Sequence, residues 1–371
     1  MRERLAALPH TRLRQGLAFA GFTQDGEGVT ASFEDGTSLR ARYLVGADGA
    51  PSPVRAAAGG GLDDLAFDEP WLVFDVLVHD ATRLPDINLQ ICDPERPTTC
   101  VLMAPGRHRW EFMLKPGETP ESISTPESIA ALLKPWNVDG AVTPERNAVY
   151  RFHALIAKAW RTGRVLLAGD AAHQMPPFAG QGLCSGLRDA ANLGWKLAGV
   201  IKGEAQATLL DTYQAEREPH VRAIIDMALM MGRTVCITDP AAAAARDAAM
   251  LAARAAEAGT GGGGGGIGWP PFSAGCILAG SPGAGELFPQ PWRDGQRLDD
   301  VLGAGPWLIA REAAADAVAL DNARLTPFRA DLTRWLNQRS ADAVLVRADR
   351  TVFGTGAASV LRDAWTRWLA A

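Results

Sequence analysis

The 371-residue sequence lacks several features that would assign it to common classes of protein. Its longest apolar runs, such as Trp71–Val78, are far shorter than the ~20 residues that a membrane-spanning helix needs. The start, Met1–Leu5, mixes charged and apolar residues and has no apolar core of a signal peptide. A net charge of -5 gives no basic footprint for nucleic acid. We therefore expect a globular protein with no membrane span and no nucleic-acid partner.

Cysteine is scarce, and its spacing follows no recognised pattern. The five cysteines stand at positions 92, 100, 184, 236 and 276, with no Cys-x-x-Cys pair and no histidines at zinc-site spacing. This pattern predicts buried free thiols and no metal site. In a chain without an export signal it also favours a reducing cytoplasm.

Strand-like runs dominate the first part of the chain. Val29–Phe33 alternates apolar and polar residues, and a second alternation over Leu39–Val45 predicts a hairpin that runs into Gly46-Ala47-Asp48-Gly49. Short runs separated by turn signals then predict an antiparallel sheet, and a short helix is expected at Ser128–Leu133. These runs are Trp71–Val78, Leu89–Cys92, Thr99–Met103 and Arg109–Leu114.

The later part predicts helices and a separate small unit. The largely apolar run Arg164–Ala168 predicts a strand that is buried on both faces. A Pro/Gly loop should follow it, and then a helix that ends at Gly203. A second helix, Leu209–Met231, contains Pro219 and should kink there. Ala241–Ala258 should be helical, and the six glycines of Gly261–Gly266 read as a linker. Residues 270–371 predict a small α/β unit with strands Trp307–Ala310 and Ala343–Val346 and helices Arg329–Gln338 and Ala358–Leu369.

Two carboxylates, Asp48 and Asp170, follow two of the expected strands. Ligands of open α/β sheets bind beyond the carboxyl ends of strands. The helix that begins near Gly182 and Leu183 offers unpaired N–H groups and a partial positive charge. Together these features indicate a site for a hydroxyl-rich, partly anionic cofactor. Taken singly, Gly169-Asp170 could be a helix cap or a surface turn, and Ala47-Asp48-Gly49 an ordinary turn.

The context of these carboxylates resembles a known family. Residues 43–55 (YLVGADGAPSPVR) and 163–173 (GRVLLAGDAAH) resemble two internal signatures of the single-component FAD-dependent aromatic hydroxylases, the p-hydroxybenzoate hydroxylase superfamily. Residues 175–197, 92–97 and 109–114 resemble its 3-(3-hydroxyphenyl)propionate hydroxylase branch more narrowly. The resemblance implies a mixed α/β fold. Its expected parts are a partial Rossmann-like FAD-binding domain (1–68 and 150–235), an antiparallel substrate sheet (69–149), an Ala-rich helix and Gly linker (236–268), and a thioredoxin-like C-terminal domain (269–371).

The resemblance also implies roles for particular residues. Asp170, after Gly169, would accept a hydrogen bond from the ribitol of FAD. The loop with Pro177, Gly180, Gln181, Gly182 and Leu183 would lie along the flavin ring. Asp48, Gly49 and Arg55 would approach the pyrophosphate or the nicotinamide cofactor. Since the C-terminal unit has no Cys-x-x-Cys, we expect a structural or dimer-contact role for it rather than a redox role.

The implied reaction belongs mainly to the cofactors. NADH or NADPH would reduce FAD, O2 would form a flavin C4a-hydroperoxide, and one oxygen atom would pass to a phenolic acid. A base could assist by removing the phenol proton. His153 and His173 are weak candidates for this base, with a structural role as the alternative, so the catalytic residue stays unknown. None of the tyrosines Tyr43, Tyr150 and Tyr213 can be assigned to the substrate.

One family feature has no counterpart before Val29. The strand, Gly-x-Gly-x-x-Gly turn and helix that hold the pyrophosphate are not found there, so we expect a chain truncated at its N-terminus, weak FAD binding and an open sheet edge. A homodimer or a separate N-terminal segment could complete the site. The alternatives are a non-catalytic remnant that acts as a binding protein, and a hydroxylase of larger phenolic natural products.

Overall fold

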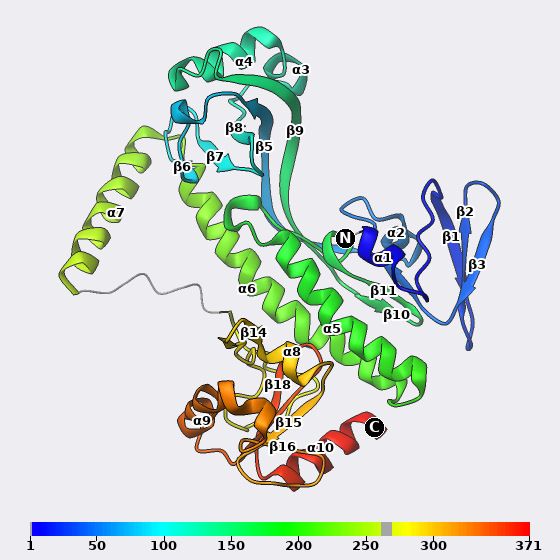
Figure 1. Ribbon diagram of the computed structural model, residues 1–371. Helices are drawn as coiled ribbons and strands as arrows, with labels where there is room; N and C mark the ends of the chain where they lie inside the picture. The colour runs from blue at the N-terminus through cyan, green and yellow to red at the C-terminus, as the bar shows by residue number, and fades with distance from the viewer. Residues whose placement is uncertain (1, 261–268) are drawn as a thin grey trace.

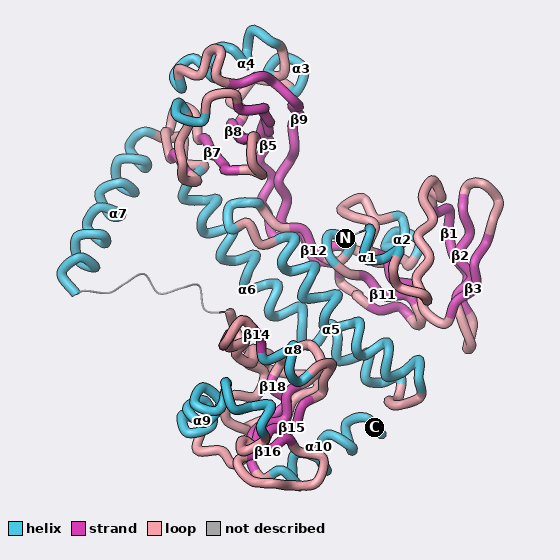
Figure 2. Tube along the Cα trace, in the orientation of Figure 1, coloured by secondary structure: helices cyan, strands magenta, loops and turns pink. Residues whose placement is uncertain are grey.

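The computed structural model describes residues 2–260 and 269–371, and its fold mixes helices with several small sheets (Figures 1 and 2). The long helix α6 links two ends of the molecule. A six-stranded sheet lies at one end, and the C-terminal unit lies at the other (Figure 1). The expected mixed α/β fold is confirmed. The linker predicted at Gly261–Gly266 lies outside the described residues.

The N-terminal part consists of helix α1 (Arg2–Ala6) and an antiparallel meander of β1 (Phe19–Gln24), β2 (Val29–Phe33) and β3 (Ser38–Ala41). The prediction of one continuous strand over Leu39–Val45 is wrong. The chain leaves the meander after Ala41, and β4 (Leu44–Gly46) joins a different sheet. The alternation of apolar residues continues across this change, so periodicity alone could not reveal it.

Strand β4 pairs in parallel with β11 (Val165–Leu167), which also pairs antiparallel with β10 (Arg161–Thr162). All three residues of β11 are buried, as its apolar sequence predicted. Within the described residues β4 is an edge strand, and Val45 is 39% exposed. A short helix, α2 (Pro53–Ala57), follows β4.

The large sheet has the strand order β12-β9-β5-β8-β7-β6. One face carries Leu72, Phe74, Trp110 and Phe112, which pack with buried residues of the helices over this face. The other face carries the polar side chains of Thr99, Arg109 and Glu111 among apolar ones, so the sheet separates a core from a cleft. The sheet and its helices comprise β5 (Leu62–Val78), β6 (Leu89–Ile91), β7 (Thr98–Leu102), β8 (Arg107–Met113), β9 (Val142–Ala157), β12 (His173–Gln174), α3 (Pro120–Ile123) and α4 (Pro126–Leu133).

Two long helices follow the sheet. Helix α5 (Gly182–Lys202) ends at Gly203, whose φ of +76° suits a residue without a side chain, and α6 (Thr212–Val235) contains Pro219. Helix α7 (Pro240–Thr260) lies apart from these two in Figure 1. No helix in the described part of the chain combines the length and apolar character that crossing a membrane requires.

The C-terminal unit is built on a four-stranded sheet of order β16-β15-β17-β18. Strands β15 (Trp307–Ala310) and β17 (Ala343–Val346) and helix α9 (Arg329–Gln338) have the bounds that the sequence predicts. Cys276 is fully buried, and burial raises the pKa of its thiol to about 12, which disfavours thiol exchange. The remaining elements are β13 (Trp292–Arg293), β14 (Gln296–Arg297), α8 (Leu298–Leu302), β16 (Val318–Ala319), β18 (Val352–Gly356) and α10 (Ala358–Ala370).

Candidate active site

The parallel strands β4 and β11 bring two of the predicted residues to one edge. Leu44 to Gly46 pair in register with Val165 to Leu167, so Asp48 and Asp170 both follow at the carboxyl end of this pair. This is the edge at which open α/β sheets bind ligands. The two sequence motifs are therefore neighbours in space, although more than 100 residues separate them along the chain.

Asp170 is exposed, in a short turn formed by Gly169–Ala171. Among the described residues its carboxylate has no hydrogen-bond partner, so its oxygens can accept hydrogen bonds from a ligand. The turn is held in place by helix α5, because the Gly169 N–H donates to Oδ2 of Asp189 at 3.0 Å. Gly169 has a φ of +60°, a conformation that favours glycine.

Asp48 and Arg55 are engaged within the fold. The Asp48 carboxylate accepts from the Ser52 hydroxyl at 2.6 Å and from the Val54 N–H at 3.0 Å. Arg55 is buried and donates to the carbonyls of Ala171 and Ala50, each at 2.7 Å. These bonds tie the loop after β4 to the turn that carries Asp170. The side chains of Asp48 and Arg55 therefore hold the backbone in place at the carboxyl ends of β4 and β11.

The start of helix α5 presents free N–H groups. Pro177–Ala179 forms a single turn, Gly180 has a φ of +61°, and Gln181 caps the helix without a side-chain hydrogen bond. The N–H groups of Gly182 and Leu183 have no acceptor among the described residues. A helix start with unpaired N–H groups is a favourable position for a partly negative ligand.

Phe178 anchors this loop against the large sheet. Its ring meets those of Phe67, Trp71 and Phe152 edge to face, with centroids 5.6–6.1 Å apart. Gly232 of α6 provides the space, because a Cβ atom at this position would lie 2.7 Å from the Phe178 ring. The position of the loop therefore depends on a glycine in a helix interior.

A cleft of about 360 Å³ lies between this loop and the polar face of the sheet. Glu111 of β8 is the ionisable residue in its lining. Its side chain is largely buried, which raises the pKa of its carboxyl group, as does the Asp75 charge, whereas Arg109 at 4.0 Å lowers it. Glu111 was not among the residues predicted for the site, although it lies in the 109–114 segment that carries the resemblance. The lining also includes Asn88, Gln90, Thr99, Pro177 and Gly180.

Neither candidate histidine lines this cleft. His173 is 1% exposed, its Nε2 lies 2.6 Å from Oδ2 of Asp189, and Trp160 covers its ring. His153 follows Phe152 on β9, so its side chain points to the opposite face of the strand, where it lies 3.7 Å from Asp68. Neither imidazole is therefore in position to take a proton from a phenol in this cleft, and a structural role stays a prediction for both.

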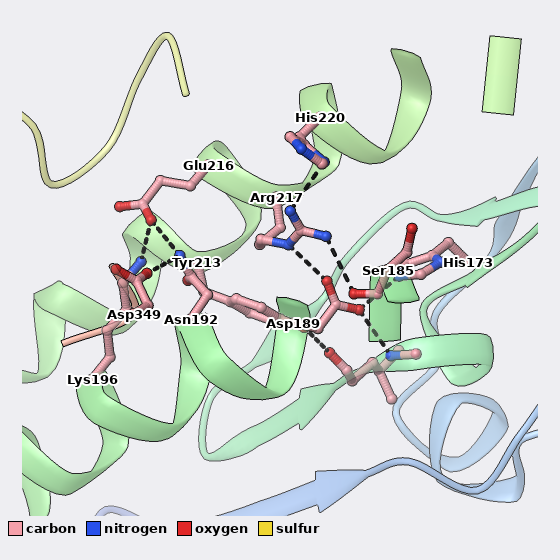
Figure 3. A network of polar contacts seen from close by, with 12 residues as sticks. His173, Ser185, Asp189, Asn192, Lys196, Tyr213, Glu216, Arg217, His220 and Asp349 are labelled. Atoms are coloured by element: carbon pink, nitrogen blue, oxygen red, sulfur yellow. Dashed lines mark hydrogen bonds and ion pairs between the residues drawn. The ribbon is translucent and has the colours of Figure 1, made fainter. Parts of the chain in front are cut away.

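A buried network of charges lies behind the site (Figure 3). Asp189 accepts from Arg217 at 2.8 Å as well as from His173 and from the Gly169 backbone. Burial alone would raise the pKa of Asp189, but the hydrogen bond from His173 and the charge of Arg217 lower it. The Asp170 turn is thus held by a carboxylate that stays ionised at neutral pH.

The network continues into the C-terminal unit. Glu216 of α6 binds Arg347 at 2.7 Å and Lys196 at 2.8 Å, and Asn192 donates to it at 2.6 Å. Arg347 also pairs with Asp349 at 2.5 Å. Burial would raise the pKa of Glu216, but the cations Arg347 and Lys196 lower it to about 2. These ion pairs attach the C-terminal unit to helices α5 and α6.

Comparison with known proteins agrees with this geometry. A family model described as FAD binding domain matches residues 1–228. The chain is 38% identical to a probable NADH-specific resorcinol 4-hydroxylase of Rhodococcus jostii (strain RHA1), over 95% of the chain and 71% of that relative. It is 40% identical to a 3-(3-hydroxy-phenyl)propionate/3-hydroxycinnamic acid hydroxylase of Mycobacterium sp. (strain KMS), over 81% of the chain. The chain spans only 55% of the length of that second relative.

A solved structure is similar over almost the whole chain. The structure of aklavinone-11 hydroxylase with FAD and aklavinone has a TM-score of 0.74 and 27% identity, and the match covers 97% of this chain and 75% of that one. The family model, the curated relatives and this structure agree with the resemblance seen in the sequence motifs. The chain therefore belongs to the FAD binding domain family, among the FAD-dependent aromatic hydroxylases.

Proposed function

We propose that this chain contributes the flavin-ring site and the substrate site of a monooxygenase that hydroxylates a single-ring phenolic acid, such as 3-(3-hydroxyphenyl)propionate. The observation that carries the proposal is the cleft between the Pro177–Gly180 loop and the polar face of the sheet. The names of relatives at 38–40% identity support a small phenol. The free cysteines are compatible with a reducing cytoplasm, which we include in the proposal.

The residues at the sheet edge fit FAD. Asp170 would accept from a ribitol hydroxyl, and the N–H groups of Gly182 and Leu183 would face the electron-rich edge of the flavin ring. Bound FAD, reduced by NADH or NADPH, supplies the O2 activation that no side chain can provide. The chain's own contribution is to orient the ring, to hold the phenol over it and to keep water out. Completion of the adenosine end by an N-terminal glycine-rich unit or a second copy stays a prediction.

Glu111 is our candidate for the group that accepts the phenol proton. It borders the cleft across from the flavin loop, and burial raises the pKa of its carboxyl group, which makes its carboxylate a stronger proton acceptor. Deprotonation makes a phenol more electron-rich and so more reactive toward an electrophilic oxygen. Arg109 is held by two hydrogen bonds to Asp75, at 2.6 and 2.9 Å, and keeps the Glu111 carboxylate oriented from one side.

The test is NADH oxidation by the protein supplied with O2, excess FAD and a glycine-rich N-terminal unit from a relative, with and without 3-(3-hydroxyphenyl)propionate or resorcinol. We expect the phenol to stimulate oxidation and to be recovered as a product heavier by one oxygen atom. If NADH is consumed equally with and without the phenol, and no hydroxylated product forms, the proposed function is wrong.

The variant Glu111→Gln tests whether this residue accepts the phenol proton, independently of the test of the overall reaction. Loss of a general base should lower kcat about 10²-fold or more and abolish the rise in rate through the pKa of Glu111, while flavin binding persists. Glu145→Gln is the matched control, because Glu145 is a partly exposed residue of β9 paired with Arg107 and does not line the cleft. An unchanged pH profile in Glu111→Gln would remove Glu111 from the mechanism without affecting the assignment of the reaction.

A further inference from the structure

A second cavity, of about 130 Å³, lies between helices α5 and α6 and the start of the C-terminal unit. It shares no lining residue with the cleft at the Pro177–Gly180 loop. One side carries cationic side chains and the other carries aromatic ones. Its main walls are Arg188, Arg217 and His220 from the helices, and Trp269, Phe272 and Leu287 from the C-terminal unit. The carboxylate of Asp349 also lines the cavity, where it pairs with Arg347 at 2.5 Å.

Arg188 is the unusual member of this lining. Its guanidinium lies 4.3 Å over the Trp269 ring, and its buried Nη1 atom has no hydrogen-bond partner within residues 2–260 and 269–371. Its one polar contact among the described residues is a long one, 3.5 Å from Nη2 to the Gln181 side-chain oxygen. No described carboxylate lies within ion-pair distance of it. Arg188 is partly buried. Burying part of a guanidinium without a counter-charge carries a cost, which a bound anion would relieve.

The neighbouring charges leave Arg188 uncompensated. Arg217 forms an ion pair with Asp189. Lys196 pairs with Glu216, and Arg347 pairs with both Glu216 and Asp349. His220 adds no negative charge, since burial and the nearby arginines lower its pKa to about 4. The buried network therefore carries one more cation than carboxylates, and the surplus charge borders the cavity.

The size and walls of the cavity restrict what could bind. An apolar cavity of about 150 Å³ accepts benzene, so a space of 130 Å³ holds about one aromatic ring. Trp269 and Phe272 offer ring faces and edges, and Arg188 offers the charge. We propose that this cavity is a binding site for a small aromatic carboxylate, separate from the active site, at the junction of α5 and the C-terminal unit.

Calorimetric titration of the full chain with benzoate tests the proposal. We expect one benzoate per chain, with benzamide, which lacks the charge, binding at least tenfold more weakly. Arg188→Leu should weaken benzoate by about ten- to a hundredfold, the effect of losing a charge-assisted hydrogen bond. Arg233→Leu is the control, because Arg233 is an exposed arginine of α6 with no described ion pair.

A second variant keeps the test decisive if Arg188→Leu does not fold. Ala191→Leu fills the cavity without altering a charge, and it should also weaken benzoate at least tenfold while the thermal unfolding curve stays cooperative. The proposal is overturned if benzoate does not bind, if benzamide binds equally well, or if benzoate binds Arg188→Leu as tightly as the unmodified chain. Should Arg188→Leu fail to fold, the Ala191→Leu titration decides in the same way.

Discussion

Replacing Gly232 by alanine tests how the flavin loop is positioned. A Cβ atom at 232 would lie 2.7 Å from the Phe178 ring and 3.0 Å from Phe67, closer than carbon atoms pack. Overpacking of this kind costs about 1–3 kcal/mol, against which alanine gains about 0.5–1 kcal/mol in a helix interior. We therefore expect a net loss of unfolding free energy of up to about 2.5 kcal/mol, together with weaker flavin binding, because Phe178 anchors the loop.

The matched control is Gly194→Ala. Gly194 also lies inside a long helix, but a Cβ atom there meets nothing within 4 Å. This variant should gain about 0.5–1 kcal/mol, so the two substitutions should differ in sign. Urea unfolding measures both free energies, and flavin fluorescence measures the binding. If Gly232→Ala is stabilised as much as Gly194→Ala and binds flavin normally, the reasoning about Phe178 fails.

Three further predictions concern the buried charges. Asp189→Ala leaves Arg217 unpaired and should lower the unfolding free energy by about 3–5 kcal/mol in urea, whereas a loss below 1 kcal/mol would contradict the network's role. Arg347→Met leaves Glu216 without its main cation, so the C-terminal unit should become protease-sensitive before the rest; simultaneous digestion would argue against this attachment. His220 has a folded pKa of about 4, below its usual 6.5, so the unfolded chain gains the proton first and stability should fall as pH drops from 6.5 to 4. His220→Gln should flatten that fall, and an unchanged pH profile of urea midpoints would exclude it as the source.

The sequence predicted those elements whose apolar pattern is strong and local. Trp307–Ala310, Ala343–Val346 and Arg329–Gln338 have the expected bounds, and the strand at Val165–Leu167 lies within its expected range. The strand β9 was missed because its first half, Val142–Asn147, contains Pro144 and several charges. It forms a strand because β5 pairs with it along most of its length, which is a contact between distant segments.

The buried network of charges could not be predicted from the sequence, for a different reason. Ser185, Asp189, Asn192 and Lys196 recur at helical spacing on α5, a pattern that ordinarily marks a solvated helix face. Here the face is buried by α6 and the C-terminal unit, and neither partner is visible in local sequence. The position of Asp170 at the end of a strand could be predicted, because a short apolar run precedes it. The contacts of Asp48 and Arg55 depend on packing and could not.

The central claim is that Asp170 and the start of α5 form a flavin site, and titration of the chain with FAD, followed by flavin fluorescence, tests it most directly. Asp170→Ala should weaken binding by about ten- to a hundredfold, the effect of losing a hydrogen bond to a charged group, with unchanged unfolding free energy. Asp342→Ala, an exposed position in the C-terminal unit, should bind as the unmodified chain does. Equal FAD affinity of the unmodified chain and Asp170→Ala, each supplied with a glycine-rich N-terminal unit from a relative, would contradict the account.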